Sequence, residues 1–187
     1  MINLRSIGFG VTAATGLILG AGMASAENVV TVNTVQIFGT VDPAKINDYT
    51  EYMAGVNLYE ALTTLDGSGA IQPLLAESWT TSEDGLIWSF TLKEGTTFQD
   101  NSPIEAKDVV WSVNRLLAIN EGPSYLFEGV LSEGSVTEID ARTVQFQLEK
   151  TYAPFLTTTP ILFIVNSDLA AENAADGDPW AQDYIAN

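Results

Sequence analysis

The stretch from Ile71 to Trp111 constrains the fold more than any other part of this chain. Within it, every second side chain of Leu86–Lys93 is apolar. Successive side chains of a strand point to opposite faces, so one face of this segment is predicted to lie in a core. The predicted core set is Leu86, Trp88, Phe90 and Leu92. Just before it, Asp84-Gly85 supplies the positive backbone angles of a tight turn, which predicts an antiparallel hairpin with Thr80–Ser82.

A helix is predicted to follow this hairpin, from about Ala106 to Ile119, because apolar residues recur there at helical spacing. Its predicted buried stripe is Val109, Val113, Leu116 and Leu117. Asp108 lies in the first turn, where a carboxylate offsets the positive end of the helix dipole. We expect a structural or surface role for Asp108 and for Arg115 rather than a direct role in function.

Two elements are predicted upstream. Val29–Phe38 is rich in β-branched residues and indicates a buried strand, which Gly39 and Asp42-Pro43 interrupt. Asn47–Leu62 has a helical period, and Asn47 or Asp48 is suited to cap its first turn. The stripe expected to pack mostly in the core is Ile46, Tyr49, Met53, Val56 and Tyr59.

The downstream half predicts further elements of both kinds. Ser135–Ile139 and Thr143–Leu148 alternate around a turn and predict a second hairpin, with Val144, Phe146 and Leu148 facing inward. A short helix is expected from Tyr152, a strand at Ile161–Val165, and a helix that starts at Asp178-Pro179-Trp180 and runs to Ile185. This mixture indicates an α/β or α+β fold.

Composition narrows the functions that remain possible. The 187 residues include 24 acidic and 7 basic side chains, for a net charge of −17, with no cysteine and no histidine. Such a charge repels phosphate backbones and anionic lipid surfaces, so we expect no binding to nucleic acid. Disulfides, thiol nucleophiles, zinc sites of the usual kind and a histidine base are excluded.

Residues 1–26 are typical of a secretory signal peptide. Arg5 supplies a positive charge, an apolar run rich in small residues follows, and Ala24-Ser25-Ala26 matches the small-x-small cleavage pattern. We therefore expect export, with cleavage after Ala26. An N-terminal membrane anchor is the alternative, and the glycine content and the Ala-Ser-Ala ending argue against it.

No catalytic motif is present, and we expect neither a bound metal nor a cofactor. The sequence has no Gly-x-Ser-x-Gly, no phosphate-binding glycine loop and no calcium loop around Asp42 or Asp48. Paired acids such as Glu83-Asp84 lie at turns, although a secreted carboxylate-dependent hydrolase stays open as an alternative. A self-standing extracellular interaction domain is a third possibility.

The order of motifs along the chain resembles the family 5 extracytoplasmic solute-binding proteins, the oligopeptide, dipeptide and nickel-type receptors of bacterial ABC importers. The quoted motifs are Leu58-Tyr59-Glu60-Ala61-Leu62, Ile71-x-Pro73-x-Leu75-Ala76-Glu77-Ser78-Trp79, Asp84-Gly85-x-x-Trp88-x-Phe90-x-Leu92, Gly95-x-x-Phe98 and Ser102-Pro103-Ile104-x-Ala106-x-Asp108-Val109-Val110. Asp42-Pro43, Asn114-Arg115, Asp140 to Leu148 and Ala153-Pro154-Phe155-Leu156 also fit. The resemblance covers residues 28–187.

Two positions depart from the family pattern. Asn101 stands where the family usually has Gly, and Glu105 stands where it usually has a Thr cap. Asn tolerates the left-handed backbone conformation, so that turn is expected to survive. Glu is a poorer helix cap, at a cost of about 1 kcal/mol or less.

The resemblance implies part of a type II periplasmic binding protein fold. The expected organisation is a signal peptide at 1–26, the start of lobe I at 27–56, a small extra domain at 57–165 and a return to lobe I at 166–187. Because family members are longer, we expect an N-terminal fragment that lacks the second lobe and much of the pocket.

The resemblance also implies capture without chemistry. We expect a periplasmic monomer, not an enzyme, that binds peptides or a similar small solute and delivers them to an ABC permease in the inner membrane. Contacts to ligand are expected from the segment after the first strand, which comprises Gln36, Ile37, Phe38, Gly39 and Thr40, and from Tyr125 in the loop after the long helix. The alternative for Tyr125 and Phe127 is that both cover the domain surface.

Overall fold

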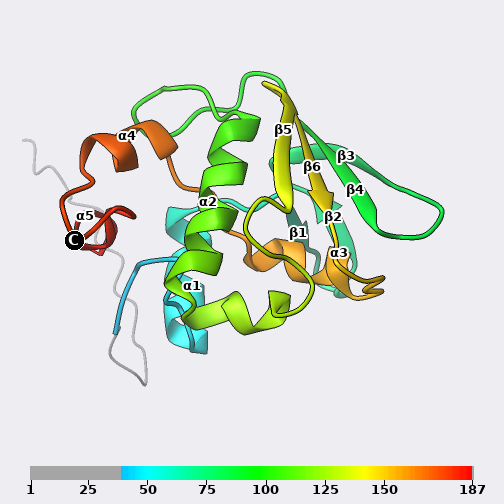
Figure 1. Ribbon diagram of the computed structural model, residues 1–187, viewed down its shortest axis with the longest axis horizontal. Coiled ribbons are helices and arrows are strands. Elements are labelled where there is room, and N and C mark those ends of the chain that lie inside the picture. Colours follow the sequence, from blue (N-terminus) through cyan, green and yellow to red (C-terminus); the bar gives the residue numbers. More distant parts are fainter. Residues whose placement is uncertain (1–38, 187) are drawn as a thin grey trace, which may run out of the picture. The chain divides into compact units, whose positions relative to one another are not determined.

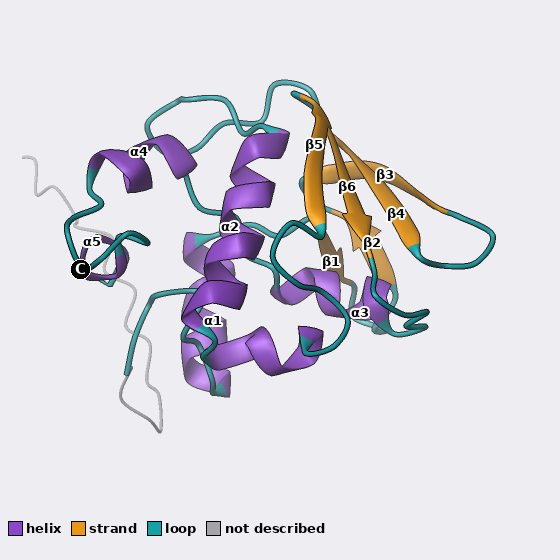
Figure 2. Cartoon of the chain, viewed as in Figure 1, coloured by secondary structure: helices purple, strands orange, loops and turns teal. Residues whose placement is uncertain are grey.

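The computed structural model describes residues 39–186. The predicted signal peptide and the predicted strand Val29–Phe38, apart from its boundary with Gly39, lie outside the described residues. Figures 1 and 2 show the described chain as a twisted sheet with one long helix across it and shorter helices alongside. Among the described helices, none is both long enough and apolar enough to cross a bilayer.

The main sheet consists of the two predicted hairpins. Its strands are β3 (Ala76–Thr81), β4 (Ile87–Leu92), β5 (Val136–Asp140) and β6 (Thr143–Gln147), in the spatial order β3-β4-β6-β5. All neighbours are antiparallel, and the hairpins join where β4 pairs with β6, with Phe90 opposite Val144. Both hairpins of the prediction are confirmed within a few residues.

One face of the sheet carries the core. Phe90, Phe146 and Phe155 are fully buried, and the Phe146 ring lies 5.5 Å from that of Phe90 and 5.4 Å from that of Phe155 in edge-to-face geometry. Such pairs stabilise a core by about 0.5–1.5 kcal/mol each beyond their burial. Helix α2 (Ala106–Ile119) covers this face with Val109 and Val113, as predicted.

The other elements frame this core. A small sheet pairs β1 (Thr63–Leu65) with β2 (Ile71–Pro73), and helix α1 (Tyr49–Leu58) precedes it. Short helices complete the described chain: η1 (Gly122–Phe127), α3 (Phe155–Thr158), η2 (Thr159–Ile161), α4 (Ser167–Glu172) and α5 (Gln182–Ile185).

The predicted core stripe of helix α1 is wrong for three of its residues. Tyr49, Met53 and Val56 are 75%, 44% and 43% exposed, so this face of the helix is open. The buried side carries Glu51 and Gly55 instead. The reason is that Glu51 accepts hydrogen bonds from the loop before the helix, and that Gly55 has no Cβ to collide with the ring of Phe163. Ile46, Tyr52 and Tyr59 do pack around Phe163, as part of a small second core.

The predicted strand Ile161–Val165 is wrong. Helix η2 occupies the chain up to Ile161, and only an isolated antiparallel bridge joins Phe163 to Ala61. The amide of Val165 then donates to the Ser112 hydroxyl at 2.9 Å instead of to a neighbouring strand. An apolar run of this length does not distinguish a strand from other buried segments.

The last helix starts later than predicted. It begins at Gln182 because Ala181 takes a left-handed conformation (φ 49°), and the Asp178 carboxylate accepts from the amide of Asp183 at 3.0 Å. Asp178 thus holds the turn before the helix.

The two departures from the family pattern are accommodated. Asn101 takes the left-handed conformation (φ 69°), as predicted. At the start of α2, the Asp108 carboxylate accepts from the amide of Glu105 at 2.9 Å. Its second oxygen accepts from the amide and the hydroxyl of Ser167. Asp108 is buried and therefore has the structural role expected of it.

Candidate ligand-binding surface

The segment after the first predicted strand is fixed to helix α1 by one carboxylate. Oε1 of Glu51 accepts from the amides of Gly39 (3.0 Å) and Thr40 (3.1 Å), and Oε2 accepts from the amide of Asn47 (2.9 Å). Glu51 is only 3% exposed. Burying a carboxylate is costly unless its oxygens are hydrogen-bonded, and these three donors meet that need.

The sequence places Glu51 where a helix favours an acid. Asp48 caps α1 by accepting from the amide of Glu51 at 2.9 Å, which confirms Asp48 as the cap. Glu51 then lies in the first turn, where the free amides and the helix dipole stabilise negative charge. The helix start thus orients the carboxylate towards the incoming chain at Gly39 and Thr40.

A buried ion pair fixes the next residues of this loop. The guanidinium of Arg115 on α2 donates to both oxygens of Asp42 at 2.6 Å, and the two side chains are 1% and 0% exposed. Nε of Arg115 donates to the carbonyl oxygen of Trp180 at 2.8 Å. One arginine therefore joins three segments that are distant in sequence, and its predicted structural role is confirmed.

Two tryptophans surround this arginine. The Arg115 guanidinium lies 5.9 Å from the centre of the Trp111 ring, which is within the range of a cation–π contact. Trp111 and Trp180 pack edge to face at 5.7 Å. Together they anchor the segment before α5 against α2.

Tyr125 and Phe127 lie on η1 and have different environments. Tyr125 is 70% exposed, whereas Phe127 is fully buried in the main core. Phe127 therefore has a structural role, as the alternative expects for it, whereas the exposed ring of Tyr125 does not fill the core. Tyr125 presents its ring to solvent and is free to contact a ligand.

The structure links η1 to the loop beyond Thr40 rather than to Thr40 itself. Gly122, at the start of η1, lies so close to the backbone of 44–46 that an added Cβ would meet it at 2.8 Å. Lys45 also approaches Glu121 at 4.0 Å. Gly39, Thr40 and Tyr125 are thus attached to a common framework, while Gln36, Ile37 and Phe38 lie outside the described residues.

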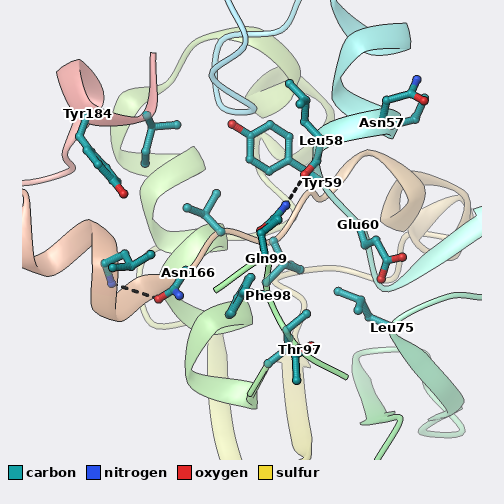
Figure 3. A pocket seen from close by; sticks show the side chains of 16 residues that line it. Asn57, Leu58, Tyr59, Glu60, Leu75, Thr97, Phe98, Gln99, Asn166 and Tyr184 are labelled. Atoms are coloured by element: carbon teal, nitrogen blue, oxygen red, sulfur yellow. Dashed lines mark hydrogen bonds between the residues drawn. The ribbon is translucent and has the colours of Figure 1, made fainter. Parts of the chain in front are cut away.

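A large open hollow lies on another part of the described chain (Figure 3). Its volume is about 630 Å³, and Leu75, Phe98 and Ile164 belong to its apolar lining. Its polar lining comes from the end of α1 and the residues after it, from the loop between β4 and α2, from the cap of α4 and from α5. The labelled polar residues are Asn57, Tyr59, Glu60, Thr97, Gln99, Asn166 and Tyr184. Nε2 of Gln99 donates to the carbonyl oxygen of Leu58 at 2.9 Å and holds one side.

The charge of this hollow is negative. Among the described residues that line it, Glu60 is the only charged one, and none of them is a cation. Burial raises the pKa of Tyr59, and the nearby Asp42 raises it further, so this phenol stays neutral. The hollow therefore suits neutral or cationic groups and disfavours anions. Sequence analysis did not identify it, because its residues are scattered over the chain.

The hydrolase alternative concerns the carboxylates of the described residues, as a metal site or as a general acid. Within 39–186 no group of three or more acidic residues is placed to hold a metal ion. The hydroxyl of Ser82 and the amide of Leu86 donate to Asp84 and hold its pKa below the ordinary value. A carboxyl with a lowered pKa does not serve as a general acid at neutral pH, and Asp84 shapes its turn, as predicted.

Comparisons with known proteins agree on one family. The model of the bacterial extracellular solute-binding proteins, family 5 Middle, matches residues 70–187. The probable D,D-dipeptide-binding periplasmic protein DdpA of Escherichia coli K12 is 35% identical over 144 residues, which cover 73% of this chain and 27% of that protein. The glutathione-binding protein GsiB of E. coli O1:K1 is 31% identical over 145 residues, with 76% and 27% covered.

Solved structures give the same result. The E. coli murein tripeptide-binding protein MppA matches with a TM-score of 0.63 and 28% identity, covering 74% of this chain and 31% of that one. Haemophilus influenzae OppA in complex with the peptide RPPGFSPFR matches with a TM-score of 0.67, 24% identity and 78% and 31% coverage, which supports the fold. The present chain thus spans about 30% of the length of its relatives, and the partial periplasmic binding protein fold is confirmed.

Proposed function

The chain belongs to family 5 of the bacterial extracellular solute-binding proteins, and from this premise we propose that it is the substrate-binding component of an ABC importer. In this role it captures a peptide or a similar small solute in the periplasm and delivers it to a permease in the inner membrane. The observation that carries the proposal is the family match over 70–187, together with relatives whose names specify peptide ligands.

We assign ligand contacts to the framework on α1 and α2. Gln36, Ile37, Phe38, Gly39 and Thr40 would present backbone groups to an extended ligand. At Gly39 and Thr40 these groups are the carbonyl oxygens, because both amides donate to Glu51. The exposed ring of Tyr125 supports a contact from η1. The fixation of Gly39 and Thr40 by Glu51 supports this role, because a preorganised loop lowers the entropy lost on binding.

The division of the chain follows the family plan in this proposal. Residues 1–26 form a signal peptide cleaved after Ala26, 27–56 begin lobe I, 57–165 form the small domain, and 166–187 return to lobe I. The protein acts as a monomer and performs no chemistry, because lobe closure around the ligand is sufficient for delivery. Arg115 would couple lobe I to the small domain through Asp42 and Trp180.

A thermal-shift screen of the protein isolated from the cells that make it tests the proposal. The panel contains dipeptides, tripeptides and longer peptides, with sugars, opines and metal chelates as controls. A ligand at a hundred times its Kd adds about 2.7 kcal/mol to the free energy of unfolding. We expect peptides to raise Tm and to be recovered unchanged. The proposal is overturned if no compound of the panel shifts Tm. It is also overturned if the protein converts a peptide and this conversion stops when one carboxylate is replaced.

A further inference from the structure

The carboxylate of Glu51 is the buried charge of α1, and its hydrogen bonds suggest a more specific role than holding the loop in place. Three backbone amides from two sides of the loop converge on its two oxygens: Gly39 and Thr40 on one, and Asn47 on the other. None of the ion pairs within 39–186 includes Glu51. The backbone amides and the start of α1 are therefore what stabilise this charge.

The Glu51 carboxylate packs so closely against Gly39 that no space is left for a side chain at this position. A Cβ at Gly39 would lie 2.6 Å from Oε1 of Glu51, closer than any stable contact of this kind. A side chain at position 39 would therefore force the Glu51 carboxylate to move, and with it the hydrogen bonds that this carboxylate accepts.

We propose that Glu51 is a positioning residue for ligand binding, which clamps Gly39 and Thr40 in the orientation that receives the ligand backbone. This inference rests on the proposed function. Glu51 does not contact the ligand itself. It fixes the direction of the peptide groups at 39 and 40, and Gly39 allows the carboxylate to reach both amides.

Amide exchange measured by NMR tests the clamp without any ligand. Replacing Glu51→Ala removes the acceptor, so we expect the Gly39, Thr40 and Asn47 amides to exchange at least about tenfold faster while the amides of β4 and β6 are unchanged. Glu51→Gln retains one carbonyl oxygen and should release Asn47 or the other two amides, but not all three. Glu60→Gln, which changes an exposed acid nearby, is the matched control. Unchanged exchange in Glu51→Ala would overturn the clamp.

A double-mutant cycle with Gly39 separates positioning from general stability. Gly39→Ala should displace the carboxylate and weaken binding by about 10-fold to 100-fold, the range for losing hydrogen bonds to a charged group. On top of Glu51→Ala, the same change should weaken binding by less than about twofold, because the clash no longer exists. Gly67→Ala is the matched control, since nothing lies within 4 Å of its added Cβ.

Binding is measured by calorimetry, with trialanine as the ligand and the protein isolated from its cells. If Glu51→Ala releases the amides but binds trialanine as tightly as the parent, the positioning role is overturned. If Gly39→Ala costs the same with and without Glu51, the coupling is absent and the proposal also fails. If the parent binds neither a peptide nor any other solute of the panel, the proposed function fails, and amide exchange still decides whether Glu51 clamps the loop.

Discussion

Removal of one partner of the Asp42–Arg115 pair should be among the most damaging single changes in the described chain. Both side chains are buried, both oxygens of Asp42 receive a guanidinium N–H at 2.6 Å, and Ala44 adds a third donor to Oδ1 at 3.0 Å. Asp42→Asn keeps the shape and removes the charge, so Arg115 is left buried without its counter-ion.

The expected magnitude follows from this burial. An uncompensated buried charge costs about 3–5 kcal/mol. At about 2–4 °C per kcal/mol for a chain of this size, Tm should fall by about 6–20 °C. This is a large part of the roughly 5–15 kcal/mol that stabilises a typical domain.

Urea unfolding followed by tryptophan fluorescence measures this loss, because Trp111 and Trp180 lie against Arg115. Glu77→Gln is the matched control: it breaks the Arg142–Glu77 pair, whose side chains are 42% and 48% exposed, and should cost less than about 1 kcal/mol. The double variant Asp42→Asn with Arg115→Met should lose no more than either single variant. A loss below about 1 kcal/mol for Asp42→Asn would refute the reasoning.

Three further predictions concern the core, one turn and one acid loop. Phe146→Ala should cost about 3–5 kcal/mol in urea unfolding because it opens a cavity, and Ile139→Ala, at an exposed site, should stay within about 0.5 kcal/mol. Asn101→Ala should cost about 1–2 kcal/mol more than Asn101→Gly in the same assay, because φ is positive there; equal values would contradict this. Hydrogen bonds from the Ser68 hydroxyl, and then from the amides of the loop, lower the pKa of Asp66 to about 2. The stability that ionised Asp66 adds is therefore present above its ordinary pKa of about 3.9, and it is lost as the pH falls from about 3.9 to about 2. An NMR titration should show this pKa and its rise in Ser68→Ala.

The sequence predicted the elements whose pattern is local and repeated. The alternation of Trp88, Phe90 and Leu92 and the turn at Asp84-Gly85 determine β4 and its hairpin, and the spacing of Val109 and Val113 determines α2. These signals depend on neighbours within a few residues. The structure confirms all of them, with the largest difference at β3, which starts at Ala76 and not at Thr80.

The sequence could not predict features that depend on distant partners. The exposed face of α1 has a helical apolar stripe, and only the positions of Glu51 and Phe163 show that the opposite face is buried. The pairing of Asp42 with Arg115 spans 73 positions, and no local pattern identifies it. The strand predicted at Ile161–Val165 failed for the same reason, because its partners are one isolated bridge to Ala61 and the hydroxyl of Ser112 on α2.

The candidate site was predictable only in part. The resemblance indicated Gly39, Thr40 and Tyr125; the structure shows the first two bonded to Glu51 and the ring of Tyr125 exposed, and their contact with a ligand stays a prediction. It did not indicate Glu51, because an acid in the first turn of a helix is an ordinary capping feature. The hollow around Glu60 and Gln99 was also missed, since its lining residues come from several separate segments.

Native mass spectrometry of the protein isolated from its own cells is the most direct test of the central claim, capture of a small solute without chemistry. We predict an additional mass in the range of a short peptide, which mild unfolding releases intact and which added peptide replaces. A protein that carries no such mass, and that gains stability from no peptide or other solute of the panel, would contradict the account.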